Sequence, residues 1–184
     1  MKKNIGPVNC LYPLPTVLVG ADVDGKPNYL PIAHVGIATP KAITLGINKI
    51  HYTNRGIIEN KTFSVNIPSE SMVTETDYCG LVSGKDVDKG ALFTNFYGKL
   101  KTAPMIEQCL LNMECRLINT VDMGTHDLFI GEVVETYCEE KILVKGVVDY
   151  AKIRPFLFDM NGRGYWKLGA RFADAWSIGK TFKK

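Results

Sequence analysis

Short runs in which apolar and polar residues alternate dominate this sequence, and they constrain its fold more than any other feature. Such runs are typical of β-strands, because successive side chains of a strand point to opposite faces. Gly, Pro and Asn interrupt them too often for long helices. We expect strands at residues 15–23, 28–33, 42–48, 62–67, 109–121 and 126–136. Many short strands with two small helices predict a mainly β fold, a closed or nearly closed antiparallel barrel.

Turn and helix signals separate these strands. Asp24-Gly25 predicts a tight hairpin, because both residues tolerate a positive φ. Pro31 predicts that its strand lies at a sheet edge or carries a bulge, since proline cannot donate to a ladder. We expect one helix at residues 54–60 with Thr53 as its N-cap, and a second at residues 69–80. Residues 84–99 read as a loop with a helical piece.

Length and charge exclude several classes of protein. At roughly 100 to 200 residues per domain, the 184 residues predict a single domain spanning 1–184, too short for separate dinucleotide and substrate domains. The net charge of +3 comes with no basic cluster, so we expect no nucleic-acid partner. No apolar run approaches the ~20 residues of a membrane span, and the N-terminus lacks the apolar segment of a signal peptide. We therefore expect a cytoplasmic protein that does not enter the membrane.

The five cysteines and three histidines do not form a metal motif. No C-x-x-C spacing occurs, and metal sites need tight thiolate clusters, so we expect no metal and reduced thiols. Cys109 and Cys115 lie in an apolar stretch, where a buried structural cysteine is the commoner case. The common nucleophile, P-loop and zinc-protease signatures are also absent. The protein itself therefore offers no obvious nucleophile or general base.

The stretch from Asn48 to Arg55 (NKIHYTNR) concentrates cationic and hydroxyl groups beside a predicted helix N-terminus. A helix N-terminus presents unpaired N–H groups and the positive end of the helix dipole, which suits a phosphate. The alternative is an ordinary Thr53 cap with solvated Lys49 and Arg55. The residues alone leave both interpretations open.

Several motifs in a fixed order give the sequence a family resemblance. They are PLPTVLV at residues 13–19, GKPN at 25–28, HVGIATP at 34–40, HYTN at 51–54, FSVNIP at 63–68, DYCGLVSGKDVDK at 77–89, THDLFIGEV at 125–133 and YWKLG at 165–169. Over nearly the whole chain the sequence resembles the flavin reductase-like family, and most closely the flavoredoxins. The resemblance implies an antiparallel, Greek-key-like split β-barrel that binds FMN non-covalently and forms a homodimer.

The resemblance also assigns the cofactor-binding residues. The FMN ring would lie along Asn28, Leu30, Pro31, Ile32, Ala33 and His34. The ribityl chain and phosphate would be held by Asn48, Lys49, His51, Tyr52, Thr53 and Asn54. Lys89 matches the family's lysine near the flavin, where a cation stabilises anionic reduced flavin and raises its potential.

His126 is a weak catalytic candidate on the same resemblance. It matches the family histidine at the flavin face, but Thr125 stands where relatives carry an acidic residue. The alternative is a histidine at a strand start that is satisfied by backbone. At His34 relatives often carry an aromatic residue, and Tyr165 or Trp166 could close the pocket or belong to the core.

The resemblance implies a flavin-dependent redox function, because the cofactor supplies the chemistry and the protein supplies binding and orientation. As an FMN-dependent oxidoreductase, the protein would take hydride from NADH or NADPH and reduce a flavin or another small acceptor. As a flavoredoxin-type electron carrier, it would receive electrons from a protein such as ferredoxin without turnover of its own. A non-redox FMN-binding module is the third possibility.

Overall fold

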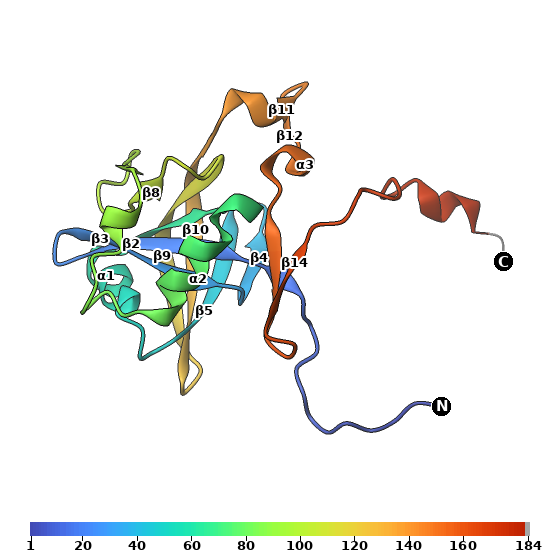
Figure 1. Ribbon diagram of the computed structural model, residues 1–184, viewed down its shortest axis with the longest axis horizontal. Helices are drawn as coiled ribbons and strands as arrows, with labels where there is room; N and C mark the ends of the chain where they lie inside the picture. Colours follow the sequence, from blue (N-terminus) through green and yellow to red (C-terminus); the bar gives the residue numbers. More distant parts are fainter. Residues whose placement is uncertain (183–184) are drawn as a thin grey trace.

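The computed structural model describes residues 1–182 and consists mainly of antiparallel β-sheet (Figure 1). The strands are β1 Leu14–Pro15, β2 Val17–Val23, β3 Lys26–Ile32, β4 Val35–Thr39, β5 Ala42–Asn48, β6 Thr62–Asn66, β7 Asn95–Phe96, β8 Met105–Ile106, β9 Leu111–Asp122, β10 His126–Cys138, β11 Leu143–Val144, β12 Val147–Val148, β13 Phe156–Asp159 and β14 Gly164–Lys167. The α-helices are α1 Thr53–Asn60, α2 Val73–Leu81 and α3 Tyr150–Ile153. Short 3₁₀ turns occupy Glu70–Met72, Gly90–Leu92, Glu140–Ile142 and Ile178–Thr181. No helix among residues 1–182 is long and apolar enough to cross a bilayer.

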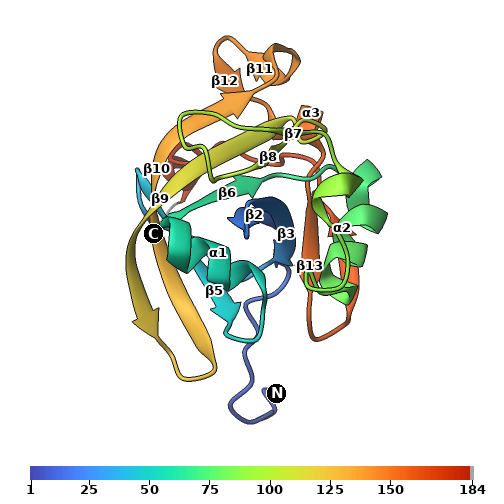
Figure 2. The same cartoon turned by 90° about the vertical axis from the view of Figure 1, so that its left-hand side faces the viewer.

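Seven strands form the large sheet in the order β3-β2-β6-β9-β10-β5-β4, and every neighbouring pair is antiparallel. The two edge strands, β3 and β4, are consecutive in the chain and are joined only by Ala33 and His34. The sheet must therefore curl until its edges approach each other, as Figure 2 shows around β2 and β3. Among residues 1–182 no ladder pairs β3 with β4, so the curled sheet is split along this line.

Burial of both faces explains why β2 is apolar at almost every position. One face of β2 belongs to a core cluster inside the curled sheet, which includes Val19, Leu45 and Phe129. The other face carries Leu18, which packs with Tyr29 of β3 in a second cluster under α2. Helix α1 crosses β2 so closely that a Cβ atom on Gly56 would lie 2.2 Å from the Asp22 carbonyl oxygen. This close approach holds the start of α1 against the sheet.

Most strands confirm the predictions from alternation, and the Asp24-Gly25 hairpin has positive φ at both residues (54° and 76°). Pro31 lies in edge strand β3, as predicted, and Cys109 and Cys115 are buried. The prediction of Thr53 as an N-cap is wrong. Tyr52 occupies the N-cap position and makes no side-chain cap. Thr53 is the first residue of the helix, and its hydroxyl accepts a hydrogen bond from the Asn28 side chain.

Strands β4, β13 and β14 were not predicted, and neither were the two-residue strands β7, β8, β11 and β12. β13 and β14 form a hairpin that pairs with β1 near the N-terminus, giving a separate three-stranded sheet. This pairing joins Leu14 to Phe158, far apart in the sequence, so no local pattern reveals it. The hairpin lies beside α2 (Figures 1 and 2).

Candidate functional site

A cavity of about 310 Å³ lies at the split between β3 and β4. Its floor is the large sheet, and its opposite wall is the β13–β14 hairpin with the end of α2. The lining residues are Thr16, Pro31, Ile32, Ala33, His34, Gly46, Asn48, His51, Asp77, Gly80, Leu81, His126, Phe158, Met160 and Tyr165. Its volume is at the lower end of the range for small-molecule sites. Apolar walls with a few polar groups suit a flat ligand with polar edges.

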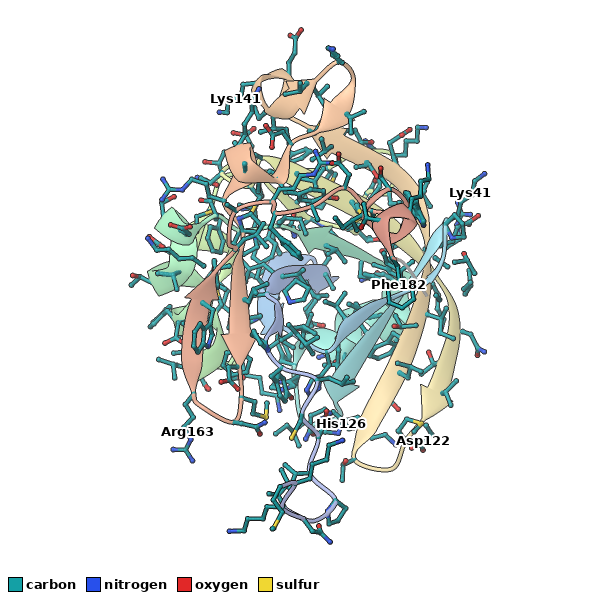
Figure 3. All side chains as sticks on the ribbon, turned by 90° about the vertical axis from the view of Figure 1, so that its right-hand side faces the viewer. Lys41, Asp122, His126, Lys141, Arg163 and Phe182 are labelled. Atoms are coloured by element: carbon teal, nitrogen blue, oxygen red, sulfur yellow. The ribbon has the colours of Figure 1, made fainter. Side chains whose placement is uncertain are left out.

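All three histidines of the chain meet in this cavity. The rings of His34 and His126 have centroids 6.4 Å apart, although they come from the β3–β4 connection and from β10. Tyr12 Oη lies 2.6 Å from His34 Nε2. His126 Nδ1 lies 2.9 Å from the Thr125 hydroxyl, so Thr125 orients the ring where relatives were expected to use an acidic residue. Figure 3 shows His126 beside the β9–β10 turn, on the side of the molecule that faces the viewer.

The environment of the cavity affects the protonation of His51. Its ring is half-buried, and burial lowers its pKa. The positive charges of Lys89 and His126 lower the pKa further. An anion bound in the cavity would oppose all three effects, so His51 is a candidate partner for a negatively charged ligand.

A second cavity, of about 280 Å³, adjoins the first along the chain. Its lining residues are Val23, Asp24, Lys26, Pro27, Asn28, Tyr52, Gly84, Lys85, Asp86, Val87, Asp88 and Lys89. The same three segments line both cavities: strand β3, the connection from β5 to α1, and α2 with the loop that follows it. A ligand longer than either cavity could therefore contact one continuous set of segments.

Two buried polar atoms at these cavities have no hydrogen-bond partner within residues 1–182. They are the Thr16 hydroxyl in the first cavity and the Asn28 side-chain oxygen in the second, on residues 3% and 4% exposed. An unsatisfied buried polar group costs about 1–3 kcal/mol. Such atoms are expected where a ligand supplies the missing partner.

Lys89 is the buried cation of the site, only 3% exposed. Its amino group donates to the carbonyl oxygens of Cys79 (2.6 Å) and Tyr29 (3.1 Å), and it forms no ion pair within residues 1–182. Burial lowers the pKa of Lys89. Carbonyl dipoles hold the amino group in place but do not neutralise its charge, so the site favours an anionic or electron-rich group.

The predicted phosphate segment looks different in the structure, because its cations already have partners. Lys49 lies 2.6 Å from Asp122 and 3.6 Å from Asp127. Arg55 pairs with Asp24 at 2.6 Å and with Glu59 at 2.9 Å. Because both cations are already paired with carboxylates, neither is free to serve a phosphate alone. The sequence did not reveal this, because the carboxylates of Asp122, Asp127 and Asp24 come from other segments.

The predicted site residues fall into three groups. Pro31, Ile32, Ala33, His34, Asn48, His51 and His126 line the first cavity, and Asn28, Tyr52 and Lys89 line the second. Leu30, Lys49, Thr53 and Asn54 line neither. Leu30 belongs to the core, whereas Thr53 and Asn54 are buried supports: Thr53 holds the Asn28 amide at 2.7 Å, and the Asn54 amide donates to Asn48 O at 2.9 Å.

The hairpin wall contains residues that the sequence did not reveal. Phe158 and Met160 come from the hairpin, and Tyr12 and Thr16 come from the segment that pairs with it. Tyr165, which was considered as a possible lid, donates a hydrogen bond to Asp77 at 2.7 Å and so ties the hairpin to α2. The Asn161-Gly162 pair is a turn signal that could have indicated this hairpin.

The side chains of the cavity provide no redox or nucleophilic chemistry of their own. Cys79, Cys109 and Cys115 are buried, and burial raises the pKa of Cys79 to about 11 and that of Cys115 to about 12. These thiols are protonated near neutral pH and do not act as nucleophiles. The arrangement is that of a binding site whose reactivity comes from what it binds.

Comparison with known proteins gives consistent matches. The family model of the flavin reductase like domain matches residues 9–156. The solved structure of flavoredoxin from Methanosarcina acetivorans superimposes with a TM-score of 0.95, at 45% identity over 98% of each chain. Flavoredoxin of Desulfovibrio vulgaris (Miyazaki F) gives a TM-score of 0.90 at 34% identity, covering 97% of this chain and 100% of that chain. An uncharacterized protein of Archaeoglobus fulgidus is 31% identical over 128 residues, 67% of this chain and 72% of its own.

Proposed function

This chain belongs to the flavin reductase-like family, and on that basis we propose that it is a redox protein that binds FMN non-covalently. The observation that carries the proposal is the pair of adjoining cavities with unpartnered Thr16 and Asn28 oxygens and a buried Lys89 that forms no ion pair within residues 1–182. The similarity to flavoredoxins over 97–98% of the chain supports it. When bound, FMN supplies the electron-transfer chemistry that the cavity side chains lack.

The residues present fit such a cofactor. Pro31, Ile32, Ala33 and His34 would hold the ring along the split, since they form the polar and apolar strip at the β3 edge. His51 and Asn48 line the first cavity, and Tyr52, the next residue after His51, lines the second, where the ribityl chain and phosphate would extend. Lys89 would provide the positive charge, while Thr53 and Asn54 position Asn28 and Asn48 from behind.

Within the broad class of flavin oxidoreductases, we propose an NAD(P)H-dependent flavin reductase-like activity. The hairpin side chains that line the cavity, Phe158, Met160 and Tyr165, are mostly apolar, which favours a flat small molecule beside the ring. The second candidate is a flavoredoxin-type electron carrier, which the similarity to two flavoredoxins favours. We propose a homodimer in either case. We also propose a cytoplasmic location, because none of the five cysteines is paired.

Two measurements test this function. The purified protein should bind one FMN per subunit and show flavin absorbance, and a protein that stays colourless with added FMN refutes the proposal. Steady-state oxidation of NADH or NADPH with free flavin then separates the two candidates. Saturable turnover supports the reductase, whereas bound FMN that cycles on photoreduction without such turnover supports the carrier.

A proton-coupled change at His51 should accompany FMN binding. Because burial and two neighbouring positive charges lower its pKa, His51 is neutral near pH 7 in the FMN-free protein. A phosphate placed beside it favours the protonated form, so its pKa should rise and FMN should bind more tightly as the pH falls from about 8 to 6. NMR titration of the imidazole with and without FMN measures the shift. An unchanged His51 pKa places the phosphate elsewhere, and His51→Ala should abolish the pH dependence.

A further inference from the structure

The last described part of the chain, residues 168–182, is an arm that leaves the body of the molecule after β14 (Figure 1). Its large side chains are exposed to solvent: Phe172 is 98% exposed, Trp176 95% and Phe182 78%. All hydrogen bonds and ion pairs of the arm stay within it, such as the Arg171–Asp174 pair and the Ser177 N–H bond to Asp174 O. Nothing within residues 1–182 therefore holds the arm against its own subunit.

The arm is rich in large apolar residues. Large apolar residues occupy the even positions Phe172, Trp176, Ile178 and Phe182, whereas the odd positions between them are mostly small or polar. Exposed apolar residues gathered in this way mark an interaction surface. Removing each such side chain from water would stabilise a complex, and the arm gains none of this stabilisation while it is exposed to solvent.

The arm projects from the side of the molecule that also carries the split in the sheet. Figure 1 shows both termini on this side, and Figure 3 views it directly, with β4, the β13–β14 hairpin and His126 facing the viewer. Edge strand β4 lies open here, with Ile37 85% exposed. The opposite edge, β3, is packed against α2. The cavity wall adds Met160, 49% exposed.

We propose that the arm of each subunit lies across this face of a second copy of the chain, so that two copies exchange arms. The proposal rests on the homodimer proposed above and names the segment that holds it together. One chain carries both the bare arm and the open apolar face, and a two-fold axis lets each arm cover the other subunit's face. The ten residues before the 3₁₀ turn at Ile178–Thr181 can span up to about 35 Å, enough to cross a small domain.

The arm exchange also affects the site. A partner arm on this face lies beside the hairpin that forms the cavity wall, so the partner contributes apolar side chains at the cavity mouth. Formation of the dimer and shielding of bound FMN from solvent should therefore occur together.

Sedimentation equilibrium of the full chain without FMN tests the proposal. The wild type should be a dimer, and the double variant Phe172→Ser/Trp176→Ser should raise the dimer dissociation constant at least about 100-fold, since two apolar anchors are lost from each arm. Ile58→Ser is the matched control, because Ile58 is a 44% exposed residue of α1 outside the arm, and its dissociation constant should equal that of the wild type. A dimer of unchanged affinity in the double variant overturns arm exchange.

A second measurement follows the arm directly. In Trp166→Phe the only tryptophan is Trp176, whose fluorescence should be blue-shifted and shielded from acrylamide in the dimer and become accessible on dilution. If Trp176 is fully accessible to acrylamide at concentrations where the dimer persists, the proposal is overturned. This holds even if the serine variants misfold. Both measurements use FMN-free protein. Failure to bind FMN in a dimer with a shielded Trp176 would therefore refute the proposed function and support the arm exchange.

Discussion

Replacing Lys89 with methionine should weaken FMN binding by about ten- to a hundredfold and lower the reduction potential of the FMN that still binds. A hydrogen bond or close contact from a charged donor contributes about 1.5–3 kcal/mol, and each 1.4 kcal/mol changes the dissociation constant tenfold. Lys89 is the buried cation of the site, and it forms no ion pair within residues 1–182. Its loss removes the charge that favours reduced, anionic flavin. Fluorescence titration with FMN and a spectroelectrochemical titration measure the two effects.

The same substitution has a second, independent signature in the FMN-free protein. Burial lowers the pKa of Lys89 below its ordinary value of 10.5, so the unfolded chain binds more protons than the folded chain between the two values. Lys89 therefore contributes free energy of unfolding that rises with pH up to about 10.5, so the stability of the wild type relative to Lys89→Met should increase with pH over this range. Lys101→Met, at an exposed lysine, is the control. If Lys89→Met binds FMN like the wild type, the lysine is only a structural support for α2.

Replacing Glu114 with alanine should destabilise the fold by about 3–5 kcal/mol, the largest stability effect we expect. The Glu114 carboxylate is fully buried in β9 and accepts hydrogen bonds from the Lys99 and Leu100 N–H groups and the Tyr137 hydroxyl, at 2.8–2.9 Å. Alanine leaves all three donors without their acceptor. It also releases the loop before β8 from the centre of the large sheet. Urea unfolding followed by circular dichroism measures the loss.

Two further variants separate the causes of this effect. Glu114→Gln keeps one acceptor oxygen and the side-chain volume, so it should lose less than half as much stability as Glu114→Ala. Glu135→Ala removes a carboxylate whose partner, Lys99 Nζ, is exposed, and exposed ion pairs contribute at most about 1 kcal/mol. A Glu114→Ala protein that is as stable as Glu135→Ala would mean that water replaces the lost acceptor.

The sequence predicted the strands whose partners are near in the chain or whose apolar pattern is strong. β2 and β3 follow from the Asp24-Gly25 turn, and β9 and β10 follow from two long alternating runs. β4 was missed because most of its residues are exposed, so burial imposes little pattern on it. β13 and β14 were missed because the strand that joins their hairpin to the rest of the fold, β1, has two residues and lies at the other end of the chain.

The sequence located the segments that form the candidate site. It did not show which charged side chains of these segments already have ion-pair partners. Motif order located Pro31–His34, His51, Lys89 and His126, which the structure brings to the two cavities. The sequence could not show that Asp122 and Asp24 return to neutralise Lys49 and Arg55, because β9 and the β2–β3 turn meet this region only in the folded sheet. It also could not show that the β13–β14 hairpin forms a wall of the cavity, because the pairing of β13 with β1 joins residues far apart in the sequence.

The hairpin wall has a consequence for how the protein matures during synthesis. All strands of the large sheet lie between Val17 and Cys138, so the sheet can assemble before the end of the chain has left the ribosome. Phe158 and Tyr165 are made later, and β1 has no partner until β13 exists. A nascent chain therefore carries a folded sheet with only one side of its cofactor cavity. Cofactor capture is therefore complete only after the β13–β14 hairpin has been added to the chain.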